Sequence, residues 1–251
     1  MPPFRLEAER HGAVTSTNDL VRAAAEAGAA AGLCIVAERQ TAGRGRHGRT
    51  WQSPSGNLYA SLLLRPERPL AEMASLSLVV AVTLAEAIEA LGCPIRPEVK
   101  WPNDVLLGGA EVAGILLEAA SADRGRCDWL IVGIGVNVRT SPAGGVGYPA
   151  TDLLAAGLPD VQPASLLTEL LPRLERDVGS WLRQGFPPFR DAWLARARGL
   201  EQPIELRLGD RLANGVLAGI DAHGAVLVRT ASGKLERFAA GELVVVTDRM
   251  G

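Results

Sequence analysis

Apolar and polar residues alternate along the first 200 positions with a period that switches repeatedly between two and about 3.6. Such switching predicts strands and helices that follow one another, as in a mixed α/β domain. The first half of this region is expected to hold a strand at residues 4–10, a helix that starts at Ser16-Thr17-Asn18 and ends before Gly32, strands at 33–37 and 57–64, and a helix at 70–91 with a broad apolar face. A strand ending at Lys100, a hairpin of 105–107 with 112–117 and a strand at 129–138 are expected next. Helices at about 163–183 and 187–198 complete the prediction. Because the strand at 129–138 is nearly all apolar, we expect it at the centre of the sheet.

The pattern changes after residue 200. From Pro203 to Val246, short apolar runs are separated by turn residues at 208–210, 221–224 and 232–233. This rhythm is typical of a small β-barrel. We therefore expect two domains, at residues 1–200 and 201–251.

Composition narrows the class of protein. Hydrophobic residues make up 47% and charged residues 22% of the chain, and the net charge of -2 argues against a dedicated nucleic-acid binder, which usually has a basic face. The N-terminus lacks a signal-peptide pattern, and residues 76–88 are too short and too interrupted by polar residues for us to expect a membrane span. Cys34, Cys93 and Cys127 form no CxxC pair, so we expect reduced thiols in a cytoplasmic protein.

An arginine- and glycine-rich segment at residues 43–51 carries the first chemical signal. Alternating glycines let backbone N–H groups approach an anion, and the interleaved arginines supply forked donors for a carboxylate or a phosphate. Trp51 at its end is suited to cover an adenine. A segment that touches RNA is the alternative interpretation, against which the ordered continuation Trp51-Gln52-Ser53-Pro54 weighs. The spacing fits neither the Rossmann fingerprint nor the P-loop.

A second cluster, Lys100-Trp101-Pro102-Asn103-Asp104, places a cation, an amide and a carboxylate at the end of a predicted strand. These groups suit a phosphate, a base or sugar, and a metal or amine, respectively. A plain Pro-Asn-Asp turn is the alternative.

Glycines inside the predicted strands give a third signal. Gly114, Gly133 and Gly135 would weaken their strands unless a ligand or another backbone approaches closely, so they suggest the floor of a pocket with Asn137 on its rim. Tight packing against a helix is the alternative. The three histidines show no metal-ligand spacing, and we assign no catalytic nucleophile.

Residues 43–51, 100–104, 112–117 and 131–138 together resemble the motifs of the biotin protein ligase family, in order along nearly the whole chain. Ser16-Thr17-Asn18 resembles the family's helix start, and Gly241-Glu242-Leu243 resembles part of its small C-terminal module. The resemblance implies an α+β fold, a mixed β-sheet flanked by helices like that of class II aminoacyl-tRNA synthetases, followed by an SH3-like β-barrel. Some members carry an N-terminal helix-turn-helix, whereas this chain starts at the catalytic domain, so DNA binding is not expected.

The resemblance also implies an activity. Biotin's carboxylate would attack the α-phosphate of Mg²⁺-ATP to give biotinyl-5′-AMP, which a lysine of a biotin carboxyl carrier domain, such as that of acetyl-CoA carboxylase, would then attack. A flexible loop at residues 40–56 would order over the adenylate.

By position, the resemblance assigns the site residues. Biotin would contact Ser16, Thr17, Asn18, Gln40, Gly43, Arg44, Arg46, Gly114, Leu116, Gly133 and Ile134. ATP and the adenylate would contact Arg46, Arg49, Trp51, Lys100, Asn103, Asp104 and Asn137, with Asp104 also the Mg²⁺ ligand. Catalysis would rest on Arg44, Arg46, Asp104 and Glu111.

Glu111 departs from the family pattern, which has a lysine three residues before the glycine that is Gly114 here, and no Lys or Arg lies between Trp101 and Ala122 to replace it. Losing a charge-assisted hydrogen bond costs about 1.5–3 kcal/mol, and a carboxylate in its place adds repulsion on the order of 4 kcal/mol. Adenylation would slow by roughly 10³-fold or more. We expect Glu111 to turn to solvent; recruitment of an extra Mg²⁺ and loss of catalysis are the alternatives.

Other functions stay open at this point. A non-catalytic protein of the same fold that binds biotin or biotinyl-AMP is the first alternative, and a nucleic-acid binder and a lipoate-attaching relative are further ones. An exposed sheet edge would serve either a homodimer or the docking of the acceptor.

Overall fold

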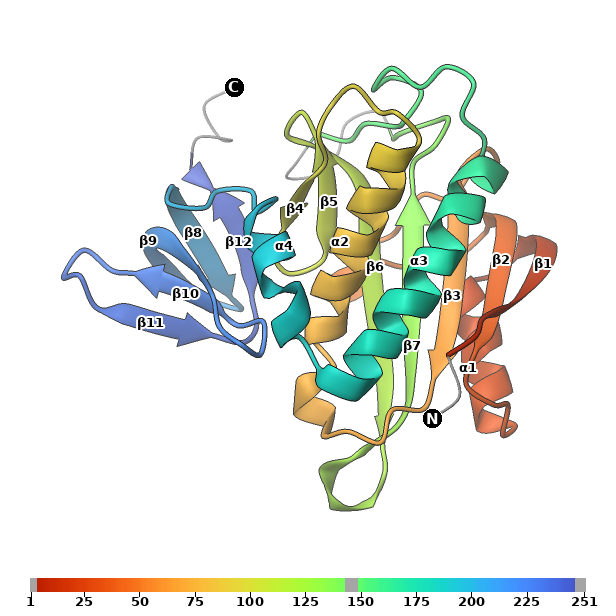
Figure 1. Cartoon of the computed structure of the whole chain (residues 1–251), viewed down its shortest axis with the longest axis horizontal. Helices are drawn as coiled ribbons and strands as arrows, with labels where there is room; N and C mark the ends of the chain where they lie inside the picture. Colours follow the sequence, from red (N-terminus) through yellow and green to blue (C-terminus); the bar gives the residue numbers. More distant parts are fainter. Residues whose placement is uncertain (1–3, 143–148, 247–251) are drawn as a thin grey trace.

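A seven-stranded mixed β-sheet forms the larger part of the molecule (Figure 1). The computed structural model describes residues 4–142 and 149–246. The strands are β1 (Glu7–Val14), β2 (Leu33–Gln40), β3 (Leu58–Leu64), β4 (Glu98–Lys100), β5 (Asp104–Leu107), β6 (Ala110–Ser121) and β7 (Cys127–Val136), in the spatial order β1-β2-β3-β7-β6-β5-β4. β1 pairs with β2 in parallel, and the other neighbours are antiparallel. The central place of β7 confirms the prediction made from its apolar sequence.

Helices cover both faces of this sheet. The short helix α1 (Thr17–Glu26) lies on one face, and α2 (Ser75–Ala90) and α3 (Pro163–Gln184) lie side by side on the other (Figure 1). The helix expected at 70–91 is a 3-10 turn (Leu70–Glu72) followed by α2, and the one expected at 187–198 is a 3-10 turn (Pro187–Phe189) followed by α4 (Arg190–Leu194). Two more 3-10 turns occur at Arg46–Gly48 and Asp123–Gly125. The mixed sheet flanked by helices is as predicted.

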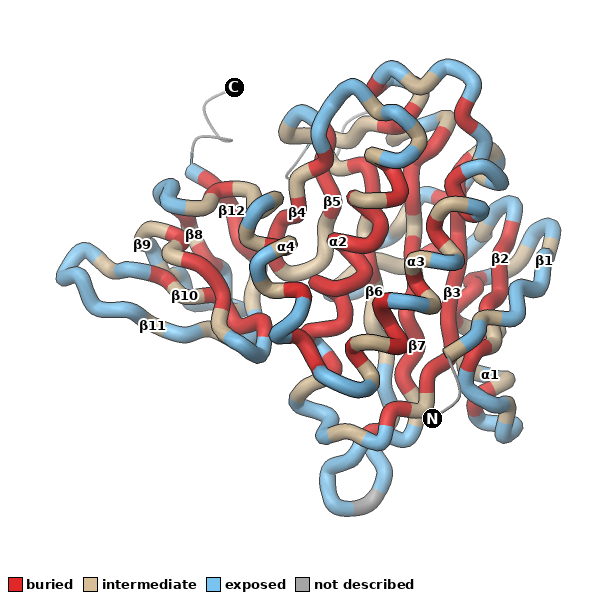
Figure 2. The backbone as a smooth tube through the Cα atoms, in the orientation of Figure 1, coloured by how far each residue is buried: buried red, intermediate tan, exposed pale blue. Residues whose placement is uncertain are grey.

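Both β3 and α2 are buried almost completely, and α2 therefore differs from the helix with one broad apolar face that the sequence predicted. Every residue of β3 is buried, because α1 covers one face of the strand and α3 the other. In α2 all residues except Glu86, Glu89 and Ala90 are buried (Figure 2). A helix that is apolar on nearly all sides belongs in the interior, and α2 is enclosed by the sheet, α3, α4 and the C-terminal strands.

Length and composition alone would let the stretch Leu70–Ala90 cross a membrane, contrary to the expectation from the sequence. In the fold, however, 78% of its apolar window is buried inside the protein. It therefore serves as a core helix of this domain.

A second, five-stranded antiparallel sheet follows, confirming the all-β segment after residue 200. It contains β8 (Pro203–Leu208), β9 (Arg211–Ile220), β10 (Val226–Arg229), β11 (Leu235–Phe238) and β12 (Glu242–Val245), in the order β11-β10-β9-β8-β12. The predicted SH3-like module is present as an open antiparallel sheet and not as a closed barrel, because the two edge strands β11 and β12 do not pair with each other.

The second sheet is packed firmly onto the first domain. The indole Nε1 of Trp101 donates a 3.0 Å hydrogen bond to the carbonyl of Gly224, in the turn between β9 and β10. Gly224 has a φ of +82°, and a Cβ there would lie 2.7 Å from Leu78 of α2, so the turn needs a glycine to approach the helix. The two sheets share one continuous core.

Candidate active site

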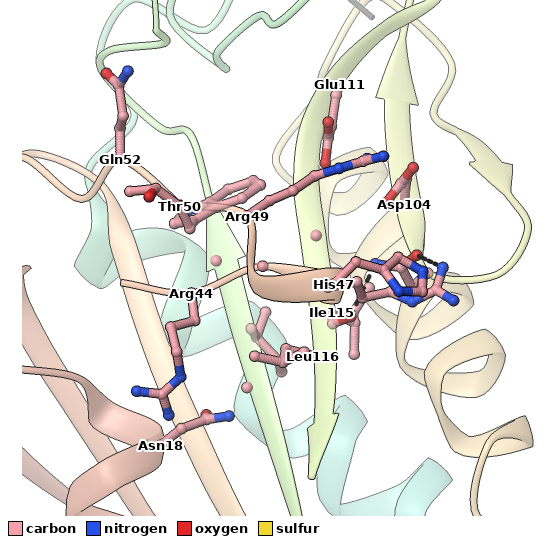
Figure 3. A pocket seen from close by; sticks show the side chains of 18 of the residues that line it. Asn18, Arg44, His47, Arg49, Thr50, Gln52, Asp104, Glu111, Ile115 and Leu116 are labelled. Atoms are coloured by element: carbon pink, nitrogen blue, oxygen red, sulfur yellow. Dashed lines mark hydrogen bonds between the residues drawn. The ribbon is translucent and has the colours of Figure 1, made fainter. Parts of the chain in front are cut away.

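A cavity of about 510 Å³ opens on the face of the large sheet that carries α1 (Figure 3). Every residue that the sequence assigned to a site lines it, except Gly43. We call its two regions the α1 end, which contains Ser16, Thr17, Asn18, Gln40 and Gly133, and the β5 end, which contains Arg46, Arg49, Lys100, Asp104, Glu111 and Glu242. Lining residues that the sequence analysis did not assign to the site include His47, Thr50, Ile115, Ala150 and Glu242.

Strands β6 and β7 form the floor of the cavity. Glycine is needed at two places on this floor, at Gly133 and at the paired Gly135 and Gly114. Gly133 is so close to Asn18 that a Cβ at this position would lie 2.4 Å from the Asn18 Oδ1. Gly135 and Gly114 pair across β7 and β6, and Cβ atoms there would lie 2.6 and 3.1 Å from the Trp51 ring. The floor glycines thus leave room for one polar and one aromatic side chain, as the sequence suggested.

Leu116 and Ile134 reach the floor differently. Leu116 pairs with Gly133 across β6 and β7 and has its side chain on the cavity face. Ile134 lies between the two floor glycines of β7, so its side chain points into the main core and only its backbone can meet a ligand.

The α1 end is built by the start of α1 and the end of β2. Ser16 occupies the N-cap position of α1, as predicted, but its hydroxyl makes no capping hydrogen bond. The Thr17 backbone N–H and hydroxyl lie 2.8 and 3.1 Å from the Gln40 Oε1. Thr17 and Asn18 are both 4% exposed. The helix start therefore offers polar groups to the cavity rather than to its own backbone.

The arginine-rich segment folds as a closed hairpin. Trp51 N–H donates to the Gly43 carbonyl at 3.0 Å, and Gly45 N–H donates to the Arg49 carbonyl at 2.8 Å. Gly43 lies behind the cavity, where a Cβ would be 2.4 Å from Ser53 Oγ and 2.5 Å from the Trp51 carbonyl. The hairpin brings the arginines to different ends of the cavity.

Arg44 points toward the α1 end (Figure 3). It donates to both carboxylate oxygens of Asp19, at 2.9 and 2.7 Å, and lies 3.5 Å from Glu118. The hydrogen bond from Arg44 lowers the pKa of Asp19. Arg44 would have to exchange this pairing to contact an anionic ligand at the β5 end.

Arg46 and Arg49 lie at the β5 end and contact the second sheet. Arg46 donates to Asn103 Oδ1 and to the Gly241 carbonyl, both at 3.2 Å, and burial lowers the pKa of Arg46. Arg49 donates to both carboxylate oxygens of Glu242, at 2.9 and 2.7 Å. The loop and the C-terminal strands therefore form the β5 end together.

The two asparagines fix backbone segments beside the cavity. Asn103 Nδ2 donates to the Ile115 carbonyl at 3.0 Å, and Asn137 Nδ2 donates to the Thr151 carbonyl at 3.1 Å. Among the described residues, the buried indole Nε1 of Trp51 has no hydrogen-bond partner. This donor on the floor of the cavity is suited to a ligand acceptor.

Charges of both signs meet at the β5 end. Lys100, which is 4% exposed, forms an ion pair of 2.7 Å with Asp104. The side chain of Glu111 lines the cavity beside Arg49 and Asp104, so the expectation that it turns to solvent is wrong (Figure 3). Burial, and then the negative charge of Asp104, raise the pKa of Glu111 to about 8. Glu111 is thus largely protonated near neutral pH.

Comparison with known proteins agrees with this geometry. The family model "Biotin/lipoate A/B protein ligase family" matches residues 12–137, and "Biotin protein ligase C terminal domain" matches residues 199–246. The chain is 40% identical to a biotin–[acetyl-CoA-carboxylase] ligase of Paracoccus denitrificans, over 80% of this chain and 85% of that protein. It is 33% identical to the bifunctional ligase/repressor BirA of Bacillus subtilis, over 92% and 71% of the two chains.

The fold is also similar to that of solved biotin protein ligases. A biotin protein ligase from Aquifex aeolicus, solved in complex with biotin and ATP, superposes with a TM-score of 0.81 at 30% identity, over 95% of this chain and 97% of that one. With motifs, fold, cavity and sequence similarity in agreement, the chain belongs to the biotin protein ligase family.

Proposed function

We propose that this protein activates biotin with ATP and transfers it to a lysine of a biotin carboxyl carrier domain. The observation that carries the proposal is the single cavity that joins a polar, glycine-floored α1 end to a β5 end with three basic side chains, Arg46, Arg49 and Lys100. The α1 end suits a small polar ring, and the β5 end suits a carboxylate beside nucleotide phosphates. The relative named as a ligase of acetyl-CoA carboxylase and the relative bound to biotin and ATP support the proposal.

In the first step, a carboxylate oxygen of biotin attacks the α-phosphorus of ATP and pyrophosphate leaves. Thr17, Asn18 and Gln40 would hold the biotin ring over Gly133, while Arg44 and Arg46 would meet the carboxylate and the α-phosphate. Trp51, Asn103 and Asn137 would contact the adenine. Arg49 and Lys100 would neutralise phosphate charge as it develops, so that catalysis rests on positioning and electrostatics.

In the second step, the uncharged amine of the acceptor lysine attacks the acyl carbon of biotinyl-5′-AMP. The bond to the phosphate oxygen breaks and AMP leaves. The hairpin at residues 43–51 would cover the adenylate and keep water from it until the acceptor arrives. The proposed acceptor is a carrier domain of acetyl-CoA carboxylase. The proposed location of the reaction is the cytoplasm.

Mg²⁺ would accompany ATP, since phosphate chemistry requires charge neutralisation. No group of three or more metal-ligating side chains occurs among the described residues, so the protein alone offers no complete metal cage. Asp104 supplies a hard oxygen ligand, but its carboxylate is already paired with Lys100, which fits an ion held mainly by ATP. Asp104 would hold the ion, and the ion would supply positive charge to the phosphates.

The two parts of the chain have different proposed roles. Residues 1–200 would supply the biotin and ATP contacts, and residues 201–251 would complete the β5 end through Gly241 and Glu242. This division follows from the contacts of Arg46 and Arg49.

Glu111 favours one alternative, a protein of the same fold that binds biotin or biotinyl-AMP without turnover. A carboxyl group stands where the resemblance implies a lysine, and it lies inside the cavity. In its protonated form it adds no negative charge, which removes the repulsion of a carboxylate but does not restore the missing cation. We therefore propose a slowed ligase.

The test is biotin-dependent release of pyrophosphate from Mg²⁺-ATP. Reactions without biotin, and with lipoate in its place, are the controls. Release that depends on biotin supports the proposal. Biotin binding measured by calorimetry without any release identifies the non-catalytic alternative, and release with lipoate alone contradicts the substrate assignment.

A further inference from the structure

One ion pair ties the arginine-rich hairpin to the start of α1. Arg44 Nη1 and Nη2 donate to Asp19 Oδ2 and Oδ1 at 2.9 and 2.7 Å, so the planar guanidinium meets the carboxylate through two bonds at once. Arg44 lines the cavity, whereas Asp19 does not. The pair therefore lies at the edge of the α1 end and joins two elements whose paired residues are 25 positions apart in sequence.

The carboxylate of Asp19 is held in place by groups outside the hairpin. Asp19 lies in the first turn of α1, where the helix dipole favours a negative charge. Arg22 of the same helix lies 3.6 Å from Asp19 and 2.7 Å from Glu118 of β6. Asn18 also donates to Glu118, at 2.8 Å. In this cluster of five side chains, α1 and the sheet supply the acceptors and only Arg44 comes from the hairpin.

Holding Arg44 in place holds both strands of the hairpin. The two neighbours of Arg44 make cross-strand hydrogen bonds: the Gly43 carbonyl accepts the Trp51 N–H at 3.0 Å, and Gly45 N–H donates to the Arg49 carbonyl at 2.8 Å. The Trp51 ring in turn lies close over the floor glycines of β6 and β7. The ion pair with Asp19 thus sets how the hairpin and its tryptophan lie over the cavity.

The pairing also decides what Arg44 can offer a ligand. Its guanidinium is committed to Asp19 through both terminal nitrogens. Its backbone N–H has no hydrogen-bond partner among the described residues, so a ligand carboxylate can meet that group while the side chain stays on Asp19. In the opposite arrangement, the ligand would take the guanidinium from Asp19. The two arrangements differ in sign, because loss of Asp19 would loosen binding in the first and tighten it in the second.

We infer that Asp19 is a positioning residue that holds the hairpin closed through Arg44 and thereby slows the escape of biotin from the α1 end. The inference rests on the proposed function and adds to it a residue outside the cavity. Arg49 ties the other side of the hairpin to Glu242 at the β5 end. The hairpin is therefore fixed at both ends, and the tie at Asp19 serves biotin while the tie at Glu242 serves the nucleotide.

The first test measures the association and dissociation rates of labelled biotin. Asp19→Asn keeps the shape of the side chain but removes its charge and one acceptor. Arg44 and Asp19 are 34% and 33% exposed, so the variant should fold, and the dissociation rate in a chase with unlabelled biotin should rise about fivefold. The association rate should stay within about twofold, because opening the hairpin does not obstruct entry. The KM for ATP should not change.

A conservative variant and salt separate positioning from a general loss of structure. Asp19→Glu keeps the carboxylate, so its dissociation rate should return to within about twofold of wild type. Because salt screens a partly exposed ion pair, high ionic strength should speed dissociation from wild type and leave Asp19→Asn nearly unchanged. A variant that had merely lost structure would respond to neither change.

The second test needs no ligand. Hydrogen exchange in the peptide that covers residues 43–51 should be about fivefold faster in Asp19→Asn and in Arg44→Gln. The double variant should be no faster than either single one, because both remove the same interaction. Glu26→Gln removes an exposed carboxylate at the other end of α1 and is the matched control, which should change neither the exchange nor the dissociation rate.

The outcomes separate the inference from the function on which it rests. If wild type binds no biotin, the proposed function fails and the retention of biotin fails with it, while hydrogen exchange still decides whether Asp19 holds the hairpin. Unchanged exchange in both single variants overturns the tie. Tighter binding of biotin by Asp19→Asn also overturns the inference, since it means that Asp19 and the ligand compete for Arg44.

Discussion

Arg49 of the hairpin and Glu242 of β12 face each other across the two sheets and share two hydrogen bonds of 2.9 and 2.7 Å. The bond from Arg49 lowers the pKa of Glu242. The Arg49 side chain is 58% exposed, so the pair stabilises the hairpin only modestly. Its importance lies in position, because it ties the segment that would cover the nucleotide to the C-terminal strands.

Glu242→Gln should release this tie. We expect the KM for ATP to rise about threefold, since an exposed pair contributes up to about 1 kcal/mol, while the Kd for biotin stays unchanged. Glu236→Gln on β11, which removes an exposed carboxylate away from the cavity, is the matched control. Initial rates of pyrophosphate release at several ATP concentrations measure the effect. An equal loss in biotin affinity would contradict a role confined to the β5 end.

Gly133→Ala and Gly135→Ala should damage different substrates. The first pushes Asn18 aside and should weaken biotin binding about tenfold, while the second displaces Trp51 and should mainly raise the KM for ATP. Gly12→Ala is the control, since a Cβ there meets nothing within 4 Å. Calorimetry with biotin and kinetics with ATP measure both. The assignment of the two glycines is wrong if both variants lose the same substrate.

Glu111 should make stability depend on pH. Its pKa is raised from 4.5 in the unfolded chain to about 8 in the fold. The native state therefore holds a proton that the unfolded state has lost, and the associated stability is full below about pH 4.5 and disappears as pH rises through about 8. Between these values, Glu111→Gln should weaken the pH dependence of Tm, whereas Glu67→Gln, at a side chain 93% exposed, should not. Parallel Tm curves for wild type and Glu111→Gln would refute the shift.

Glu111→Lys should raise the rate of adenylation. The new cation would lie near Asp104 at the β5 end and supply the charge that the carboxyl group does not. A gain of at least tenfold in pyrophosphate release is expected, at about 1.4 kcal/mol per tenfold. Glu111→Gln is the control for losing the carboxyl group without adding a charge. If neither variant releases pyrophosphate faster than wild type, Glu111 does not slow adenylation and the prediction is wrong.

Much of the fold was predictable from local pattern. The strands up to β7, the turns of the C-terminal segment and the floor glycines all depend on residues close in sequence, whose period and turn chemistry are legible. The enclosure of α2 and the open second sheet were not, because they depend on which elements pack together. Part of the helix, at Ser75 and Leu78, is covered by the turn at Gly224, more than 100 residues away.

In the site, too, some features were predictable from local sequence and others depend on packing. Motif positions placed Trp51, Lys100 and Gly133 at one cavity, but the pairing of Arg44 with Asp19 and of Arg49 with Glu242 depends on side-chain direction in three dimensions. The buried Ser61 of β3 donates to Thr17 and Asn18, yet it carried no signal in the sequence, because a serine in a buried strand has no pattern that reveals its partner. The inward turn of Glu111 went against the expectation for a charged residue, and its raised pKa resolves the conflict.

The central claim is that this chain joins biotin to an acceptor lysine at the expense of ATP. The most direct test incubates the purified protein with biotin, Mg²⁺-ATP and an apo biotin carboxyl carrier domain, and follows the mass of the carrier by intact mass spectrometry. The account predicts that one biotin is added, that addition requires ATP, and that a carrier whose target lysine is replaced by arginine stays unmodified. A carrier that remains unmodified at long times and high enzyme concentration, although the protein binds biotin, would contradict it.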